Sequence, residues 1–271
     1  MALSSDIRYP LGDALSLFGR TAAVVGACRY LGTAIAARLA HAGAAVVVAT
    51  TEADVAQVMA DIAHEMTDGV ASSDKARAIA LGTDPADPAV MGSIADRALG
   101  EFGRLDVWVQ VASAPRRQPA ILSPTPDRLS VDATWGGYLG ARAVALRMSS
   151  VAGGVIVNVA PWPCCGAGPE DTARSLSPDR GLAGLTSRLA VEFEPFGVRV
   201  FGIVPTTRQG STFGRPRDGR VGPGEAVDSV VVRLPLGRGE LLEDAPGAVL
   251  FCASDLSMYM SGSTLLVSAD A

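Results

Sequence analysis

Short runs of apolar, mostly β-branched residues alternate with longer alanine-rich stretches along the whole chain. Runs that are apolar throughout, rather than at every second residue, are what a parallel sheet covered on both faces requires. Their strict alternation with helical stretches predicts a doubly wound α/β fold with a parallel seven-stranded sheet. The predicted strands are Thr21–Val25, Ala45–Thr50, Ala76–Leu81, Val107–Val111, Val155–Val159, Val198–Val204 and Leu265–Val267. The predicted helices are Leu31–Ala42, Ala53–Thr67, Pro88–Phe102, Asp127–Ser149, Pro178–Phe193 and Glu240–Ala253.

One segment, Thr206–Val227, interrupts this pattern because it is rich in Gly, Arg and Pro and has little apolar periodicity. A connection of this length in a compact domain is usually a functional lid or a mobile stretch. Composition alone does not separate a substrate lid from a disordered segment. No internal repeat and no clean linker divides the chain, so residues 1–271 are predicted to form a single domain.

The composition excludes several classes of protein. Hydrophobic residues make up 48% and charged residues 19% of the 271 positions, which is too apolar a balance for a disordered chain. A formal net charge of −5 argues against nucleic acid or an anionic membrane surface as the main partner. With only two histidines, His41 and His64, a histidine-rich metal site and a Ser-His-Asp arrangement are disfavoured. We therefore expect a small-molecule substrate and no metal.

Targeting signals and disulfides are not expected either. The first eight residues lack a basic region followed by an apolar core, and no apolar run is long enough to span a bilayer. The four cysteines (Cys28, Cys164, Cys165 and Cys252) lack C-x-x-C spacing, and two of them are neighbours. This pattern disfavours a disulfide framework, so a reduced, cytoplasmic protein is the expectation.

The turn after the first predicted strand contains two glycines, Gly26 and Gly32, and a helix follows it. A glycine at the strand end allows a tight turn, and Gly32 lets the helix N-terminus approach a pyrophosphate. An ordinary glycine turn would share this spacing. The strand before it, and a second strand about twenty residues on, favour a dinucleotide site of the Rossmann type.

The end of the second predicted strand indicates which dinucleotide would bind. The sequence there is Thr50-Thr51, where an NAD site would place an acidic residue for the ribose 2′-hydroxyl. Hydroxyl groups without a carboxylate suit a 2′-phosphate better, and Arg29 could be its cationic partner. A solvated surface arginine would fit that position as well. NADP(H) is the predicted cofactor.

Several motifs resemble the short-chain dehydrogenase/reductase family in its single-domain form. The turn from Gly26 to Gly32 stands where the family has T-G-x-x-x-G-I-G, and Thr83-Asp84 follows the third strand, where the family's Asp contacts adenine. Leu105–Ser113 is similar to the family's stretch ending N-N-A-G. The later matching segments are Gly181–Glu192, Gly197–Val200, Pro235–Arg238, Ala248–Asp255 and Ser261–Leu265. The resemblance implies cofactor contacts at Gly26, Cys28, Arg29, Tyr30, Leu31, Gly32, Thr50, Thr51, Asp84, Ala112, Asp179 and Pro205.

The Asn-Ser-Tyr-Lys set with which the family reduces carbonyls is replaced in this chain. Alignment on Gly181 puts Ser175 at the tyrosine position and Asp179 at the lysine position, and Thr134 falls where the asparagine belongs. The only lysine is Lys75, so no Tyr-x-x-x-Lys exists anywhere in the sequence. Ser175 and Thr134 remain candidate catalytic positions.

Other positions depart from the family as well. Tyr30 replaces the middle glycine of the phosphate turn, so its side chain must turn outward or cover the cleft. Tyr138 and Arg142 have the Tyr-Lys spacing but lie in the fourth predicted helix, and arginine stays charged. That pair is typical of a helix surface or a subunit interface.

The replaced residues favour an unusual substrate. A serine hydroxyl cannot replace tyrosine as an acid, because its pKa lies far above the working pH. An iminium is already cationic, and its reduction develops no oxyanion. Carboxylates at Asp179, Glu170 and Asp171 could stabilise such a cation, and Trp162 could stack on it. A solvated acidic loop and a core tryptophan are the competing interpretations.

Loss of the whole catalytic set resembles the fungal bifunctional reductase/Diels–Alderases of indole alkaloid pathways, in the pattern of losses rather than in a motif. This resemblance implies an enzyme of specialised metabolism that reduces an iminium, guides a cyclisation, or both. Two alternatives stay open: a cofactor-independent cyclase or isomerase that uses pocket carboxylates, and a catalytically inactive binding or assembly subunit. Helices equivalent to Asp127–Ser149 and Pro178–Phe193 form the family's subunit interface, which implies a homodimer or homotetramer.

Overall fold

The computed structural model describes residues 14–26, 31–51, 59–60, 62, 78–83, 88–111, 140–149, 153–160, 178–206 and 244–268. The strands are β1 (Thr21–Val25), β2 (Ala45–Thr50), β3 (Ala78–Gly82), β4 (Val107–Val111), β5 (Gly154–Val159), β6 (Val198–Thr206) and β7 (Ser263–Ser268). The labelled helices are α2 (Leu31–His41), α4 (Pro88–Phe102), α7 (Pro178–Phe193) and α9 (Asp244–Ala253). Residues 140–148 are also helical, and short 3-10 turns lie at Glu194–Phe196 (η2) and Asp255–Ser257 (η3).

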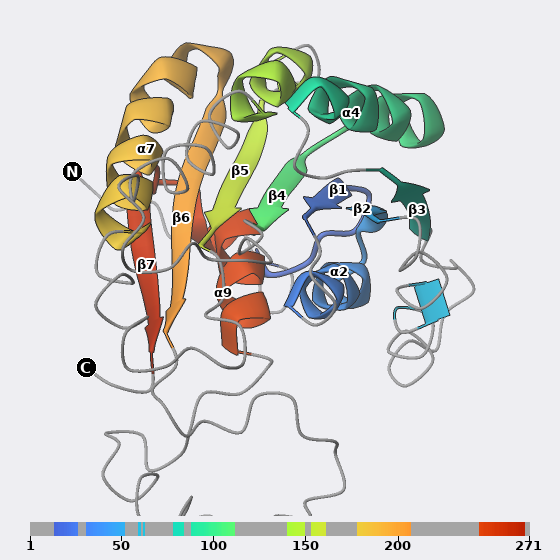
Figure 1. Cartoon of the computed structure of the whole chain (residues 1–271), viewed down its shortest axis with the longest axis horizontal. Coiled ribbons are helices and arrows are strands. Elements are labelled where there is room, and N and C mark those ends of the chain that lie inside the picture. Colours follow the sequence, from blue (N-terminus) through green and yellow to red (C-terminus); the bar gives the residue numbers. More distant parts are fainter. Residues whose placement is uncertain are drawn as a thin grey trace, which may run out of the picture.

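The seven strands form one parallel sheet in the order β3-β2-β1-β4-β5-β6-β7 (Figure 1). This order confirms the predicted doubly wound α/β fold. From β1 the chain first builds outward through β2 to β3, then returns to the other side of β1 and builds outward through β4 to β7. The reversal makes β1 and β4 the neighbouring strands at the topological switch point.

Helices cover both faces of the sheet (Figure 1). Helices α2 and α9 pack together on one face, whereas α4, the helix at 140–148 and α7 cover the other. Successive side chains of a strand point to opposite faces, so Val24 and Val109 face α2 and α9 while Ala23 and Trp108 face α4 and α7. All of these side chains are buried, which explains why the strands are apolar throughout.

The last strand is longer than its apolar pattern predicts. The predicted range was Leu265–Val267, whereas β7 begins at Ser263. Ser263 and Thr264 pair through their backbones with Phe201 and Gly202 of β6. The backbone pairing of β7 therefore begins at two polar residues, directly before the hydrophobic stretch that the sequence pattern identifies.

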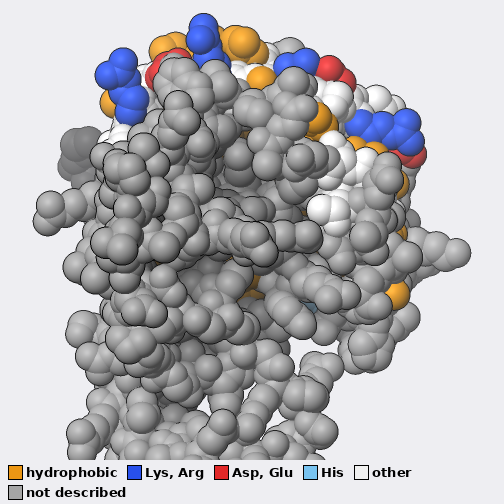
Figure 2. Space-filling model, in the orientation of Figure 1, with side chains coloured by type: hydrophobic (Ala, Val, Ile, Leu, Met, Phe, Trp, Pro, Cys, Tyr) orange, Lys and Arg blue, Asp and Glu red, His pale blue; other side chains and the backbone are white. Residues whose placement is uncertain are grey.

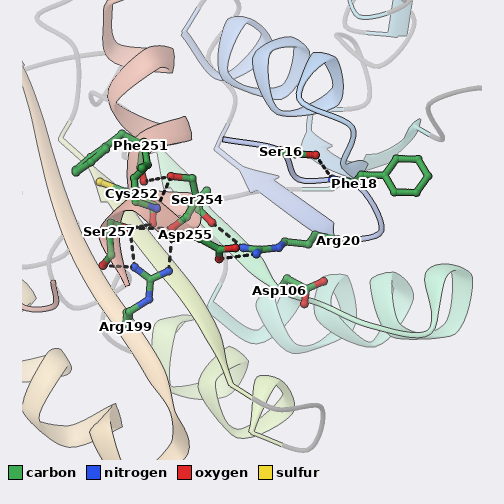
Figure 3. A network of polar contacts seen from close by, with 12 residues as sticks. Ser16, Phe18, Arg20, Asp106, Arg199, Phe251, Cys252, Ser254, Asp255 and Ser257 are labelled. Atoms are coloured by element: carbon green, nitrogen blue, oxygen red, sulfur yellow. Dashed lines mark hydrogen bonds and ion pairs between the residues drawn. The ribbon is translucent and has the colours of Figure 1, made fainter. Parts of the chain in front are cut away.

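The amino ends of the strands are joined by a network of arginine contacts (Figure 3). Arg20, just before β1, donates to the Asp255 carboxylate at 2.6 Å and to the Ala253 carbonyl at 3.2 Å. Arg199, in β6, donates to the Ser257 carbonyl at 2.6 Å and to the Ser257 hydroxyl. Burial, and secondly the nearby Arg20 charge, lower the pKa of Arg199 from its ordinary value. The network ties η3 to the start of the sheet.

Candidate active site

The carboxyl ends of β1 and β4 define the candidate site. In a doubly wound sheet, ligands bind beyond the carboxyl ends of the strands at the switch point, because the crossovers on either side leave in opposite directions there. Val25, the last residue of β1, pairs with Gln110, the penultimate residue of β4. We call the carboxyl ends of β1 and β4 the switch-point edge.

Gly26 begins the turn at this edge and is fixed there by geometry. Its φ is +79°, in the left-handed region that favours glycine. A Cβ atom built on Gly26 would lie 2.0 Å from the backbone carbonyl oxygen of Val111, far inside van der Waals contact. The end of β1 therefore passes directly against the end of β4. The glycine predicted from the motif is the one residue type that fits both constraints.

Leu31 and Gly32, two further predicted cofactor residues, are buried at the start of α2. The helix follows β1 and therefore runs away from the carboxyl edge, so its N-terminal end faces that edge. Unpaired N–H groups and the helix dipole make such an end favourable for phosphate. With Gly26 at the close approach, this arrangement fits the pyrophosphate of a dinucleotide.

Thr50 and Thr51 lie at the carboxyl end of β2, next to β1. The Thr50 side chain is buried, and the Thr50 carbonyl accepts a hydrogen bond from the Thr83 amide at 2.8 Å. Thr51 is only half-buried. Of the two predicted hydroxyls, Thr51 thus offers the larger surface to a ligand at this edge.

Pro205 and Asp179 also belong to the carboxyl side of the sheet. Pro205 is buried near the end of β6 and pairs with Val267 of β7. Asp179 lies in the first turn of α7, which follows β5 and therefore starts on the carboxyl side. Its side chain is outside the described part. The other predicted site residues outside the described ranges are Cys28, Arg29, Tyr30, Asp84, Ala112, Thr134, Trp162, Glu170, Asp171 and Ser175, and the proposed lid beyond Thr206 also lies outside them.

The structure adds two polar residues at this end that were not predicted as site residues. Gln110 and Asn158 lie next to each other on β4 and β5, each one residue before its strand ends. Within the described part of the chain, neither the Gln110 side-chain Oε1 nor the Asn158 Nδ2 or Oδ1 has a hydrogen-bond partner, and all three atoms are buried. The sequence signal was a polar residue between valines, Val-Gln-Val and Val-Asn-Val, inside an apolar strand.

Two other classes of site find no support in the described part of the chain. Within it, no group of three or more His, Cys, Asp or Glu side chains is placed to hold a metal ion. No helix there combines the length and apolar character needed to cross a membrane.

The strand order and the edge geometry define a doubly wound α/β protein of the Rossmann type, and known proteins narrow that class. Residues 26–269 match the family model described as enoyl-(acyl carrier protein) reductase. The chain belongs to the short-chain dehydrogenase/reductase family of oxidoreductases. Dehydrogenases of this family use NAD(H) or NADP(H).

Individual relatives cover almost the whole chain. The sequence is 30% identical to D-threitol dehydrogenase from Mycolicibacterium smegmatis over 93% of this chain and 92% of that protein. It is 32% identical to cis-4-hydroxycyclohexanecarboxylate dehydrogenase from Sinomonas cyclohexanicum over 92% of this chain and 94% of that protein. A solved short-chain alcohol dehydrogenase structure from Sinorhizobium meliloti superposes with a TM-score of 0.71 at 29% identity, covering 95% of this chain and 97% of that one.

Proposed function

We propose that this chain binds NADP(H) at the switch-point edge and reduces a preactivated, cationic C=N bond, an iminium, or guides its cyclisation. The observation that carries the proposal is in the sequence: Lys75 is the only lysine, and no Tyr-x-x-x-Lys pair exists. Reduction of a carbonyl develops an alkoxide that needs an acid, whereas reduction of an iminium gives a neutral amine. The missing acid therefore counts against a carbonyl substrate and not against an iminium.

The cofactor half of the proposal rests on the geometry at β1 and α2. Gly26 lets the end of β1 pass directly against the Val111 carbonyl of β4, where any Cβ would clash, and the N-terminal end of α2 favours phosphate. Thr51 at the end of β2, with Arg29 in the turn, would bind a 2′-phosphate. When bound, the dinucleotide supplies a hydride; the chain's own residues hold it and orient the substrate.

The substrate half rests on the residue types around the start of α7. Asp179 replaces the family's lysine there, so a negative charge stands where a positive one is usual. With Glu170 and Asp171 just before the helix, this charge would stabilise a cationic substrate, and Trp162 would stack on its planar group. The same charge would disfavour a developing oxyanion.

A thermal-shift experiment on nucleotide-free protein tests the cofactor. A ligand at a hundredfold its Kd adds about 2.7 kcal/mol to the stability of the folded state. We expect NADPH and NADP+ to raise the Tm more than NADH does, and Arg29→Ala to remove that preference. Arg188→Ala, which changes an exposed arginine on α7, is the matched control and should leave the preference intact. No shift with any dinucleotide would contradict the cofactor half.

Isotope transfer tests the reaction. NADPH deuterated at C4 should pass its label to a cyclic iminium, and Glu170→Gln should slow this transfer while leaving the NADPH thermal shift in place. Oxidation of D-threitol or cis-4-hydroxycyclohexanecarboxylate, the substrates named for two relatives, is expected to be absent. Efficient oxidation of either would show an ordinary dehydrogenase instead. Cyclisation of the substrate in the absence of nucleotide, with no deuterium in the product, would favour the cofactor-independent cyclase. Absence of any turnover would favour the inactive subunit.

We also propose that the chain assembles into a homodimer or homotetramer through the helix at 140–148 and α7. Each of these helices exposes an apolar side chain, Leu146 at 56% and Val191 at 72%. Along this edge of the molecule, apolar side chains lie between the charged ones (Figure 2). Light scattering on the purified chain tests the assembly, with Leu146→Glu and Val191→Glu expected to yield smaller species.

A further inference from the structure

Buried polar groups without partners are concentrated on one face of the sheet. In the described part, six residues have a buried side-chain nitrogen or oxygen atom that makes no hydrogen bond. Five of them lie on the face covered by α4, the helix at 140–148 and α7. They are Trp108, Gln110, Asn158, Thr186 and Thr264, and only Thr33 of α2 lies elsewhere.

The strand register places three of these residues at one level of the sheet. Gln110 pairs with Asn158, Asn158 with Gly202, and Gly202 with Thr264, from β4 to β7. Residues paired at one level of a parallel sheet project to the same face. On β1 the same level is Val25, which packs in the core beneath α4 and α7. The paired side chains therefore face those helices, at the level of Val25, the last residue of β1.

Two glycines make space for the polar atoms. A Cβ on Gly140, in the helix at 140–148, would lie 3.0 Å from the side-chain Oε1 of Gln110. A Cβ on Gly202 would lie 2.7 Å from the Thr264 hydroxyl oxygen and 2.8 Å from that of Thr186, which comes down from α7. The two threonine hydroxyls thus converge over Gly202 from a strand and a helix. We call Gln110, Asn158, Thr186 and Thr264 the polar row.

Leaving these groups without partners would be costly. Asn158 is only 4% exposed and Thr186 is fully buried, so bulk water does not reach them. A buried polar group that makes no hydrogen bond destabilises the folded state, and native proteins satisfy such groups with side chains or with ordered water. The two side-chain amides and two hydroxyls of the polar row can also supply the two to four hydrogen bonds that an internal water molecule needs.

We propose that the polar row is an internal hydration site in which ordered water molecules bridge β4, β5 and β7 to α7. Neighbouring strands are about 4.8 Å apart, so a water molecule with two hydrogen bonds of ordinary length spans the gap between Gln110 of β4 and Asn158 of β5. Since β6 separates β5 from β7, a second water molecule is needed between Thr264 and Thr186. The Trp108 indole N–H, one level lower on the same face, is a further donor to this water. The water molecules hold the last residues of β4 and β5 in place beneath the switch-point edge.

A crystal structure at a resolution that shows ordered solvent tests the proposal on the unmodified chain. We expect density for at least one water molecule within hydrogen-bond distance of two or more atoms of the polar row. Direct bonds between these side chains, or a dry row, would overturn the proposal. Because this test needs neither nucleotide nor substrate, its result is independent of the proposed enzymatic function.

The sign of a stability change tests it in solution. Thr186→Val keeps the shape and removes the hydroxyl; if that hydroxyl binds water, the Tm falls, and if it is unpaired, the Tm rises. Thr33→Val is the matched control, since Thr33 is also buried and unpartnered but lies outside the row. We expect a lower Tm for Thr186→Val and for Thr264→Val, and an equal or higher Tm for Thr33→Val. A rise for Thr186→Val comparable to that for Thr33→Val would contradict the proposal.

A double variant tests whether one water molecule binds both threonine hydroxyls. If one water molecule bridges the two hydroxyls over Gly202, Thr186→Val and Thr264→Val together should lower the Tm by less than the sum of the single changes. Strict additivity would contradict a shared water at Gly202.

Discussion

The two ends of the sheet treat their polar groups in opposite ways. At the amino end the chain pairs its charges with itself: Arg20 with Asp255, Arg199 with Ser257, and the Asp106 carboxylate with the Thr21 amide at 2.8 Å. At the carboxyl end Gly26 brings β1 directly against the Val111 carbonyl of β4, and the polar row has no hydrogen-bond partners within the described part of the chain.

This difference assigns stability mainly to the amino end of the sheet and ligand binding to the carboxyl end. Groups whose hydrogen bonds are complete within the chain lock the fold and have little left to offer a ligand. Groups that need partners from outside the chain, whether phosphate at α2 or water at the polar row, concentrate where a doubly wound sheet binds ligands. Substitutions at the carboxyl end should therefore change ligand binding, whereas substitutions at the amino end should change stability alone. The expected effects decrease from the glycine turn, through the amino end, to the helix surface.

The largest effect is expected at Gly26. Gly26→Ala combines a left-handed backbone, which costs a side chain about 1–2 kcal/mol, with a clash against the Val111 carbonyl worth about 1–3 kcal/mol. Chemical denaturation should show the sum, and dinucleotide binding should be lost. Gly19→Ala is the matched control, because Gly19 has φ +75° but nothing within 4 Å of the added Cβ. Equal losses of stability in the two variants would mean that close approach to β4 is unimportant.

Gly26 also illustrates what a sequence reveals. Its role follows from a short-range pattern, a strand, a glycine and a helix, and the valine-rich runs of β1, β2, β4 and β5 predicted the central strands in the same way. In both cases residues near in sequence determine the local structure. The position of Asp179 at the start of α7 was predicted for this reason too.

Long-range pairing was not predictable in this way. Arg20 and Asp255 are 235 positions apart, and nothing local to either one points to the other. The polar row depends on register, because a shift of one residue would turn Gln110 and Asn158 to the other face. The roles of Arg29, Glu170 and the other site residues outside the described ranges stay predictions.

At the amino end, Arg199→Met should lower stability by about 2–3 kcal/mol. The change removes the charge-assisted hydrogen bonds from Arg199 to the Ser257 carbonyl and hydroxyl, although the carbonyl still accepts from the Met260 amide. It should leave dinucleotide affinity unchanged, because the site lies at the opposite end of the sheet. Arg97→Met, at an exposed position on α4, should change stability by less than about 0.5 kcal/mol. A loss of dinucleotide affinity in Arg199→Met would contradict the assignment of stability and binding to opposite ends of the sheet.

The Cys252 thiol, also at the amino end, predicts a loss of stability in alkali. Burial raises the pKa of this thiol from 9.0 to about 12 in the folded protein. Between these values the unfolded chain releases the proton while the folded chain keeps it, so stability falls as the pH rises. The loss is on the order of 1 kcal/mol at about pH 10. Denaturation curves of the wild type and Cys252→Ala at pH 8 and pH 10 should differ by this extra loss; parallel pH dependence would show that the thiol is not shielded.

The smallest effect is expected at the surface, where neither end is involved. Arg147 of the helix at 140–148 forms a two-pronged ion pair with Asp96 of α4, with N–O distances of 2.6 and 2.8 Å. The hydrogen bond from Arg147 lowers the pKa of Asp96, so any stabilisation is present at neutral pH and is lost as the pH falls through that lowered pKa. Exposed pairs contribute little to stability, and Arg147→Met should hardly move the unfolding midpoint at neutral pH.

The pKa of Asp96 is the sensitive readout for this pair. An NMR titration of Arg147→Met should show it rising toward the ordinary value. Arg97→Met should leave it lowered, because Arg97 pairs with Glu101 along the same helix. An unchanged pKa in Arg147→Met would mean that the two helices are not joined by this contact in solution.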